Sequence, residues 1–195
     1  RSHQGNSQII PLSPDGALDF SEVEFAPNSV LSFQLANGET GVINKVPPKV
    51  PEDLLVAVDA TASGNRQPLP DKWSSAVFDS RAWEGPAGVA IVAICDAANW
   101  KNPLPHLDGR INPGPTSLPL IVASALAIDS WVADEKNLAA KIAAINSDIR
   151  SYLKTNIPDC DLAPGGADHL ISASFLYVNA EQLVTKLADK GYSVD

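Results

Sequence analysis

A carboxylate that could take part in chemistry stands at the end of the apolar run Leu54–Val58, where Asp59 begins the tetrapeptide Asp-Ala-Thr-Ala. A short apolar run bounded by turn residues predicts a strand covered on both faces, as in α/β sheets. Open α/β sheets bind ligands at the carboxyl ends of such strands. Asp59 is therefore a candidate ligand-binding residue. The alternative is a structural residue that caps the following turn.

A second candidate segment lies between the apolar runs Ser75–Phe78 and Gly88–Ile94, which are both predicted strands. Residues 78–88 read Phe-Asp-Ser-Arg-Ala-Trp-Glu-Gly-Pro-Ala-Gly. Asp79 and Arg81 have opposite charges two positions apart, so we expect them to pair. Ala82 can be explained simply as a small residue in a tight turn.

Residues 78–88 resemble the cofactor-lysine segment of the cysteine desulfurase branch of the class V aminotransferases, enzymes that use pyridoxal phosphate (PLP). That segment reads roughly Phe-Ser-x-His-Lys-aromatic-x-Gly-Pro-x-Gly. The residues in register are Phe78, Trp83, Gly85, Pro86 and Gly88. The Schiff-base lysine falls on Ala82, the preceding histidine on Arg81 and a phosphate-binding serine on Asp79. The resemblance thus implies a chain without the amine that the chemistry of the family requires.

The resemblance extends to Asp59, which matches the family's Asp-Ala-x-Gln motif. Its Asp pairs with the PLP ring nitrogen and keeps the ring electron-withdrawing. The Gln that contacts the ring oxygen falls on Ala62, and an Asn that contacts the cofactor falls on Gly38. The turn around Gly38 is also explained by Asn-Gly turn chemistry alone.

Three further residues are cofactor-binding candidates by resemblance. His3 could match the histidine that stacks on the PLP ring, or it could be a solvated terminal residue. Thr116 lies at the expected start of a helix, where an anion such as the cofactor phosphate could bind across a dimer. Arg81 could offset the repulsion between Asp79 and that phosphate, or simply pair with Asp79. His106 and His169 are expected at the surface, and Cys95 is expected to be a buried small residue.

The elements that must position these residues follow from the hydrophobic pattern. Two long helices are expected, one from Thr116 or Ser117 to about Asp134 and one over Lys136–Thr155. The remaining expected elements are strands at Ser7–Pro11, Val30–Leu35, Leu170–Val178 and Tyr192–Asp195 and a helix at Ala180–Lys190. The resemblance implies an α/β fold, the three-layer PLP-dependent transferase-like large domain with a mostly parallel sheet, here incomplete. We expect this portion over residues 1–156 and the start of a small α+β domain over 157–195.

Composition limits the classes of partner. The 195 residues have a net charge of −9, which makes nucleic acid and anionic membranes poor partners. The longest apolar run, Leu118–Ile128, is too short to span a bilayer. The two cysteines show no metal-binding pattern. Without a signal-peptide pattern, the expected compartment is the cytoplasm. Because the sequence contains no methionine, we expect it to be a piece of a longer protein.

The function that we expect is that of a cysteine desulfurase-like protein with a degenerate site, which lacks PLP chemistry and acts as a binding or structural subunit. The resemblance implies a homodimer or a pairing with an intact relative. If PLP binds at all, it is not bound covalently. The alternative is an active PLP-dependent cysteine desulfurase or aminotransferase with Asp59 as the ring-nitrogen partner. A third possibility is that the chain binds a small molecule, without PLP, in the cleft expected at the end of the strand Leu54–Asp59.

Overall fold

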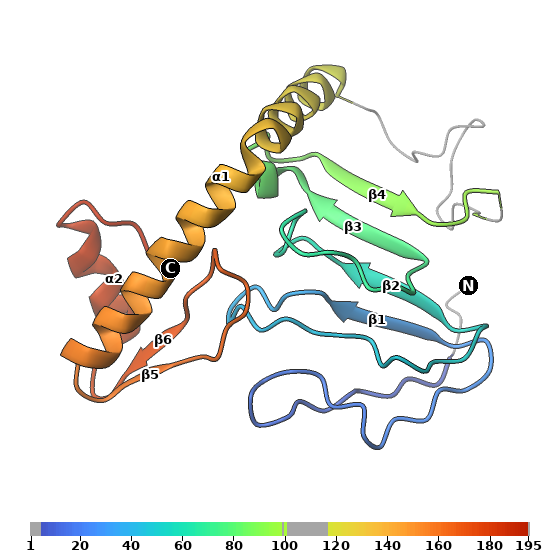
Figure 1. The fold of residues 1–195 in the computed structure, drawn as a ribbon, viewed down its shortest axis with the longest axis horizontal. Coiled ribbons are helices and arrows are strands. Elements are labelled where there is room, and N and C mark those ends of the chain that lie inside the picture. The colour runs from blue at the N-terminus through green and yellow to red at the C-terminus, as the bar shows by residue number, and fades with distance from the viewer. Residues whose placement is uncertain (1–4, 99, 101–116, 195) are drawn as a thin grey trace.

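The computed structural model describes residues 5–98, 100 and 117–194. Its centre is a four-stranded sheet in the order β1-β2-β3-β4 (Figure 1). The strands are β1 (Val30–Gln34), β2 (Leu55–Asp59), β3 (Ser75–Asp79) and β4 (Ala90–Ile94). β1, β2 and β3 run parallel, and β4 is antiparallel to β3. The mostly parallel sheet and four of the expected strands are thereby confirmed, with bounds shifted by one or two residues.

The sheet buries one of its faces. The alternating side chains Leu31, Phe33, Val56, Val58 and Ala76 form the core on that face. Half-buried residues of the loops around the sheet pack against them, among them Phe20, Phe25 and Trp73. The opposite face stays open among the described residues: Val30, Leu55 and Val92 are each more than half exposed. The expectation that the strands are covered on both faces is therefore wrong for this chain as described.

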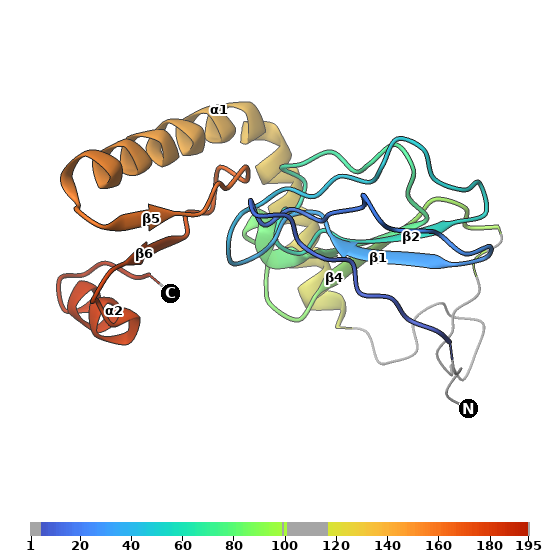
Figure 2. The ribbon, with the colours of Figure 1, turned by 90° about the horizontal axis from the view of Figure 1, so that it is seen from below.

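One continuous helix, α1 (Leu118–Asn156), replaces the two helices expected from the sequence. Residues 134–137 are charged or polar but include neither Gly nor Pro, so nothing in the backbone stops the helix there. Pro119 lies in the first turn, where its missing N–H costs no hydrogen bond. Its 39 residues correspond to about 58 Å along the helix axis at 1.5 Å per residue, and the axis bends on its way from the sheet to the small C-terminal unit (Figure 1 and Figure 2).

The C-terminal unit consists of the antiparallel strands β5 (Cys160–Leu162) and β6 (Ala173–Phe175), followed by α2 (Ala180–Ala188). The side chain of Asn179 caps α2 by accepting a hydrogen bond from the Gln182 N–H. Figure 2 shows that this unit lies beside the second half of α1, away from the sheet.

Two expected strands are absent where the structure describes them. Residues 7–11 form no strand, and neither do residues 192–194. The strand expected over Leu170–Val178 is reduced to the three residues of β6. These segments have apolar residues of strand type, but strands need a hydrogen-bonding neighbour, which the pattern of one segment does not supply. The helices in the described part of the chain are too short or too polar to cross a bilayer.

Candidate functional site

The candidate residues meet at the carboxyl ends of the parallel strands. Asp59 ends β2 and pairs in register with Val77 of β3, so Asp79 follows two residues farther along the neighbouring strand. A 3-10 helix, η1 (Ser80–Trp83), begins directly after Asp79. The structure thus places Asp59, Asp79, Arg81 and the Ala82 position along one edge of the sheet.

The carboxylate of Asp59 is occupied by its own turn. Its Oδ1 accepts hydrogen bonds from the Thr61 backbone N–H at 2.9 Å and from the Thr61 hydroxyl at 2.6 Å. This is the turn-capping arrangement that the sequence left open as the alternative. The side chain is half-buried at the strand end, and its role toward a cofactor remains a prediction.

Asp79 and Arg81 form the expected pair. Arg81 donates from Nε to both carboxylate oxygens, at 3.0 and 3.1 Å, and from Nη2 to Oδ2 at 2.6 Å. Asp79 also accepts the Arg81 backbone N–H at 2.8 Å and so caps η1. These hydrogen bonds from Arg81 hold the pKa of Asp79 below its ordinary value. The guanidinium of Arg81 is directed to Asp79 and is largely exposed.

Position 82 contacts the loop that follows β2. A Cβ added at Gly64 would lie 2.7 Å from the Cβ of Ala82, and Gly64 has φ +56°. Similarly, a Cβ added at Gly38 would lie 3.5 Å from the Cβ of Ala62. Gly38 and Ala62, two positions at which the sequence departs from the family motifs, are therefore neighbours, and Ala82 lies beside Gly64 of the loop after β2.

The segment 78–88 is fixed to α1 by a buried polar cluster. The hydroxyl of Ser124 accepts a hydrogen bond from the Ser80 hydroxyl at 2.9 Å and another from the Trp83 indole N–H at 3.2 Å. Ser80 is fully buried and Trp83 is 2% exposed. Gly85 donates its backbone N–H to the Ser80 carbonyl at 3.0 Å, and this bond closes the turn. Residues retained from the family motif thus have a structural role.

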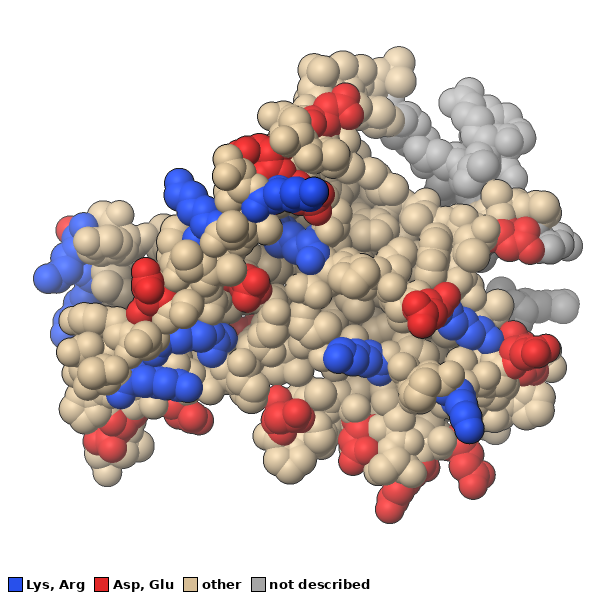
Figure 3. All heavy atoms as spheres, viewed as in Figure 1, with Lys and Arg blue, Asp and Glu red and all other residues tan. Residues whose placement is uncertain are grey.

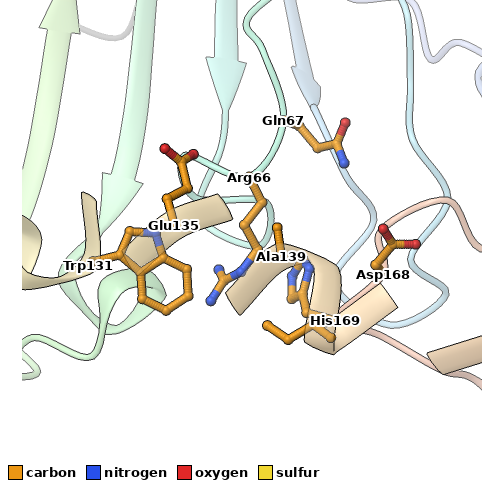
Figure 4. A pocket seen from close by; sticks show the side chains of 8 residues that line it. Arg66, Gln67, Trp131, Glu135, Ala139, Asp168 and His169 are labelled. Carbon is orange, nitrogen blue, oxygen red and sulfur yellow. The ribbon is translucent and has the colours of Figure 1, made fainter. Parts of the chain in front are cut away.

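A cavity that the sequence did not reveal lies near this edge. Arg66, Trp131 and His169 line it together with Gln67, Glu135, Ala139, Ile142 and Asp168 (Figure 4). The guanidinium carbon of Arg66 lies 4.4 Å from the centroid of the Trp131 ring, a cation–π contact. His169 Nε2 is 2.7 Å from the Ala62 carbonyl oxygen. His169 is half-buried, which corrects its expected place at the surface.

Burial changes the pKa values in the cavity. It lowers the pKa of His169; the hydrogen bond to Ala62 opposes this shift, and the Arg66 cation adds to it. Burial also lowers the pKa of Arg66, against the raising effect of the Glu84 carboxylate. Arginine stays charged nevertheless, because its unperturbed pKa lies far above neutral pH. No spacing in the sequence connects these three residues, since they come from the loop after β2, from α1 and from the loop before β6.

The other residues considered from the sequence either lie apart from this site or fall outside the described residues. His3, His106 and Thr116 lie outside the described residues. Lys72, a conceivable substitute for the missing lysine, donates to the backbone carbonyls of Pro51 and Glu52 before the sheet strands begin. Its amine is therefore held at the opposite end of the strands from Ala82. Cys95 is exposed, which corrects its expected burial. In the part of the chain that the structure describes, no cluster of three metal-binding side chains occurs.

The fold is similar to that of several solved structures. A NifS-like protein matches with a TM-score of 0.80 at 22% identity, over 96% of this chain and 56% of its own. DndA from Streptomyces lividans matches with a TM-score of 0.74 at 20% identity, over 93% and 56% of the two chains. The sphingosine-1-phosphate lyase Bpss2021 of Burkholderia pseudomallei matches with a TM-score of 0.69 at 18% identity, over 96% and 50%.

The class that the fold defines follows from these similarities. The chain has the fold of these solved structures, as the resemblance of the segment 78–88 to PLP-dependent transferases predicted. It spans about 56% of the length of the NifS-like protein. No family model matches the chain, and no curated protein matches it by sequence. The comparisons therefore define the fold and leave the activity to be argued from the residues.

Proposed function

We propose that this chain forms no Schiff base with PLP at position 82 and acts as a binding or structural subunit of cysteine desulfurase-like fold. The observation that carries this proposal is Ala82 itself: its side chain ends at a methyl group beside Gly64, so the position that the motif aligns with the family's lysine carries no amine. A Schiff base requires an amine at one defined position beside the cofactor ring.

The residues around position 82 do not fit PLP either. Gly38 and Ala62 have no side-chain amide with which to contact the ring, and they lie against one another. The Asp79 carboxylate would repel the cofactor phosphate. Arg81 is already paired with Asp79. Among the candidates that the structure describes, only Asp59 fits, as a partner for a ring nitrogen. We therefore derive no catalytic step through PLP for this chain.

The alternative is an active PLP-dependent desulfurase or aminotransferase in which Asp59 holds the ring nitrogen. Its support is the position of Asp59 at the carboxyl end of β2, where ligands of open α/β sheets bind. The same carboxylate, however, already accepts two hydrogen bonds from Thr61. Both bonds go to Oδ1, so they do not by themselves exclude a ring nitrogen at this carboxylate. The missing amine at position 82 is what favours the subunit without PLP chemistry.

Reduction with borohydride separates these two functions. After incubation with PLP and reduction, we expect peptide mass spectrometry to find no lysine labelled stoichiometrically, because the position of the motif's lysine is Ala82 and Lys72 is held at the other end of the strands. Ala82→Lys is the informative control. Labelling of the introduced lysine in Ala82→Lys, with no labelled lysine in the unchanged chain, would support the proposal, because it would show that position 82 lacks only the amine. Stoichiometric labelling of one lysine in the unchanged chain, with release of sulfide from cysteine, would contradict the proposal.

A partner subunit is part of the proposal. We infer that the chain pairs with itself or with an intact relative, and the open sheet face with exposed Val30, Leu55 and Val92 supports such a partner. Acidic and basic side chains are interspersed over the face in Figure 3, without a continuous basic surface for nucleic acid. We also propose that the large α/β domain ends at residue 156, that the small α+β domain begins at residue 157, and that the protein is cytoplasmic.

The contact between Gly64 and Ala82 can be tested by mutation. Gly64→Ala is expected to lower the free energy of unfolding by about 2–3 kcal/mol, from left-handed backbone strain and overlap with Ala82. Adding Ala82→Gly removes the overlap but leaves the strain, so the double variant should regain about 1 kcal/mol. Urea unfolding of all four proteins measures both values. Additive effects in the double variant would show that the two residues do not touch.

A further inference from the structure

The cavity lined by Arg66, Trp131 and His169 is a concave site where three distant segments meet. Its volume is about 90 Å³. In Figure 4 the guanidinium of Arg66 lies between the rings of Trp131 and His169. At about 30 Å³ per water molecule, this space holds about three waters or a small organic group of similar size.

Two buried N–H donors on side chains that line the cavity have no hydrogen-bond partner among the described residues. They are Nε of Arg66 and Nε1 of Trp131. Trp131 is 7% exposed, so bulk water does not solvate its ring nitrogen freely. A buried donor without a partner is unfavourable by about 1–3 kcal/mol. Because both donors belong to side chains that line one cavity, an acceptor inside it would satisfy them.

The charges around the cavity restrict what this acceptor can be. Arg66 supplies one positive charge, while Glu135 and Asp168 supply two negative ones. The burial that lowers the pKa of His169 favours its neutral form. Asp168 is exposed and Glu135 is half-buried, so water screens their charges. A dianion such as phosphate or sulfate would still be repelled by them about twice as strongly as a monocarboxylate, and only one guanidinium is available to balance it. A single carboxylate matches one guanidinium and is small enough for the volume.

We propose that the cavity binds a small monocarboxylate whose oxygens accept hydrogen bonds from Arg66 and from the Trp131 indole. The site is separate from the residues that the family motif aligns with its cofactor. It is nevertheless tied to the same loop, because His169 bonds to the carbonyl of Ala62. Occupancy would therefore order the loop after β2 together with the middle of α1. The inference goes beyond the proposed subunit role and holds whether or not PLP binds.

The test is a titration of the chain with acetate and propionate, followed by NMR and by thermal unfolding at constant ionic strength. We expect saturable binding and a rise in the unfolding midpoint, since a ligand that binds only the folded state stabilises it. Phosphate and sulfate at the same concentrations should give no saturable change. A titration with chloride at the same ionic strength measures the nonspecific effect of salt and is the control.

Two variants assign the binding to the donors. Arg66→Gln removes a charged donor and should weaken acetate binding by about tenfold to a hundredfold. Trp131→Phe keeps an aromatic ring but removes the N–H, and it should weaken binding about twofold to tenfold. Lys154→Gln removes one positive charge from an exposed position near the end of α1 and should leave the affinity unchanged.

The proposal is overturned by any of three results. The first is the absence of saturable acetate binding up to about 50 mM, where a millimolar site would be nearly filled. The second is equal binding of phosphate or sulfate. The third is an equal loss of affinity in Lys154→Gln and Arg66→Gln, which would indicate nonspecific attraction. If Arg66→Gln does not fold, the Trp131→Phe comparison decides by itself.

Discussion

Replacing Trp83 by alanine is expected to lower the free energy of unfolding by about 3–5 kcal/mol, the range for truncating a large buried aromatic residue. Trp83 is 2% exposed and is among the largest fully buried side chains of the described residues. Its indole N–H donates to the Ser124 hydroxyl at 3.2 Å and so connects η1 with α1. The truncation therefore creates a cavity and also removes a hydrogen bond between the sheet edge and the long helix.

The contributions of packing and hydrogen bonding can be separated. Trp83→Phe keeps most of the apolar volume and removes the N–H, so we expect a loss of about 1–2 kcal/mol. Tyr192→Ala removes an aromatic side chain that is 65% exposed and should change stability by less than about 0.5 kcal/mol. Urea unfolding at equilibrium measures all three. A loss in Trp83→Ala no greater than in Tyr192→Ala would mean that Trp83 is not part of the core.

Replacing Gly85 by alanine is the second large expected effect, a loss of about 3 kcal/mol at the upper end for overpacking. A Cβ at this position would overlap the Ser80 hydroxyl and would lie 3.0 Å from the Ser80 carbonyl oxygen and 3.2 Å from Nε1 of Trp83. The Ser80 hydroxyl cannot turn aside without giving up its hydrogen bond to Ser124. The carbonyl belongs to the backbone and has less freedom still.

Two controls accompany Gly85→Ala. Gly5→Ala adds the same methyl group where nothing lies within 4 Å, so it should be close to neutral. Combining Gly85→Ala with Ser80→Ala removes the overlapping hydroxyl and should recover about 1 kcal/mol relative to the sum of the single effects. Thermal and urea unfolding give the coupling. Equal stabilities of Gly85→Ala and Gly5→Ala would show that the turn does not close on Ser80 in solution.

These two predictions bear on why the segment 78–88 resembles an active-site segment at all. Trp83 and Gly85 match the family motif, and both have structural contacts that need no cofactor. If both variants unfold readily, the retained residues are explained by the fold alone. The departures at positions 38, 62 and 82 then indicate a site on which the fold does not depend.

The sequence determined much of the sheet and the strand ends at which the candidate residues lie. Mostly apolar runs of four to seven residues bounded by turn residues predicted β2, β3 and β4, although the described residues cover only one face of the sheet. The pairing of Asp79 with Arg81 was also predictable, since two opposite charges lie two residues apart. The motif in residues 78–88 predicted the fold itself, as the similarity to the NifS-like protein confirms.

Only the tertiary structure decided the other features, because each depends on contacts between distant residues. Local pattern did not show that α1 is continuous or that only one sheet face is covered by the described residues. It also placed His169 at the surface, whereas the fold brings it to Ala62, 107 residues earlier in the chain. Hydrophobic period sets which face of an element is apolar. What lies against that face is set by how the elements pack, and this packing created the cavity of Arg66, Trp131 and His169.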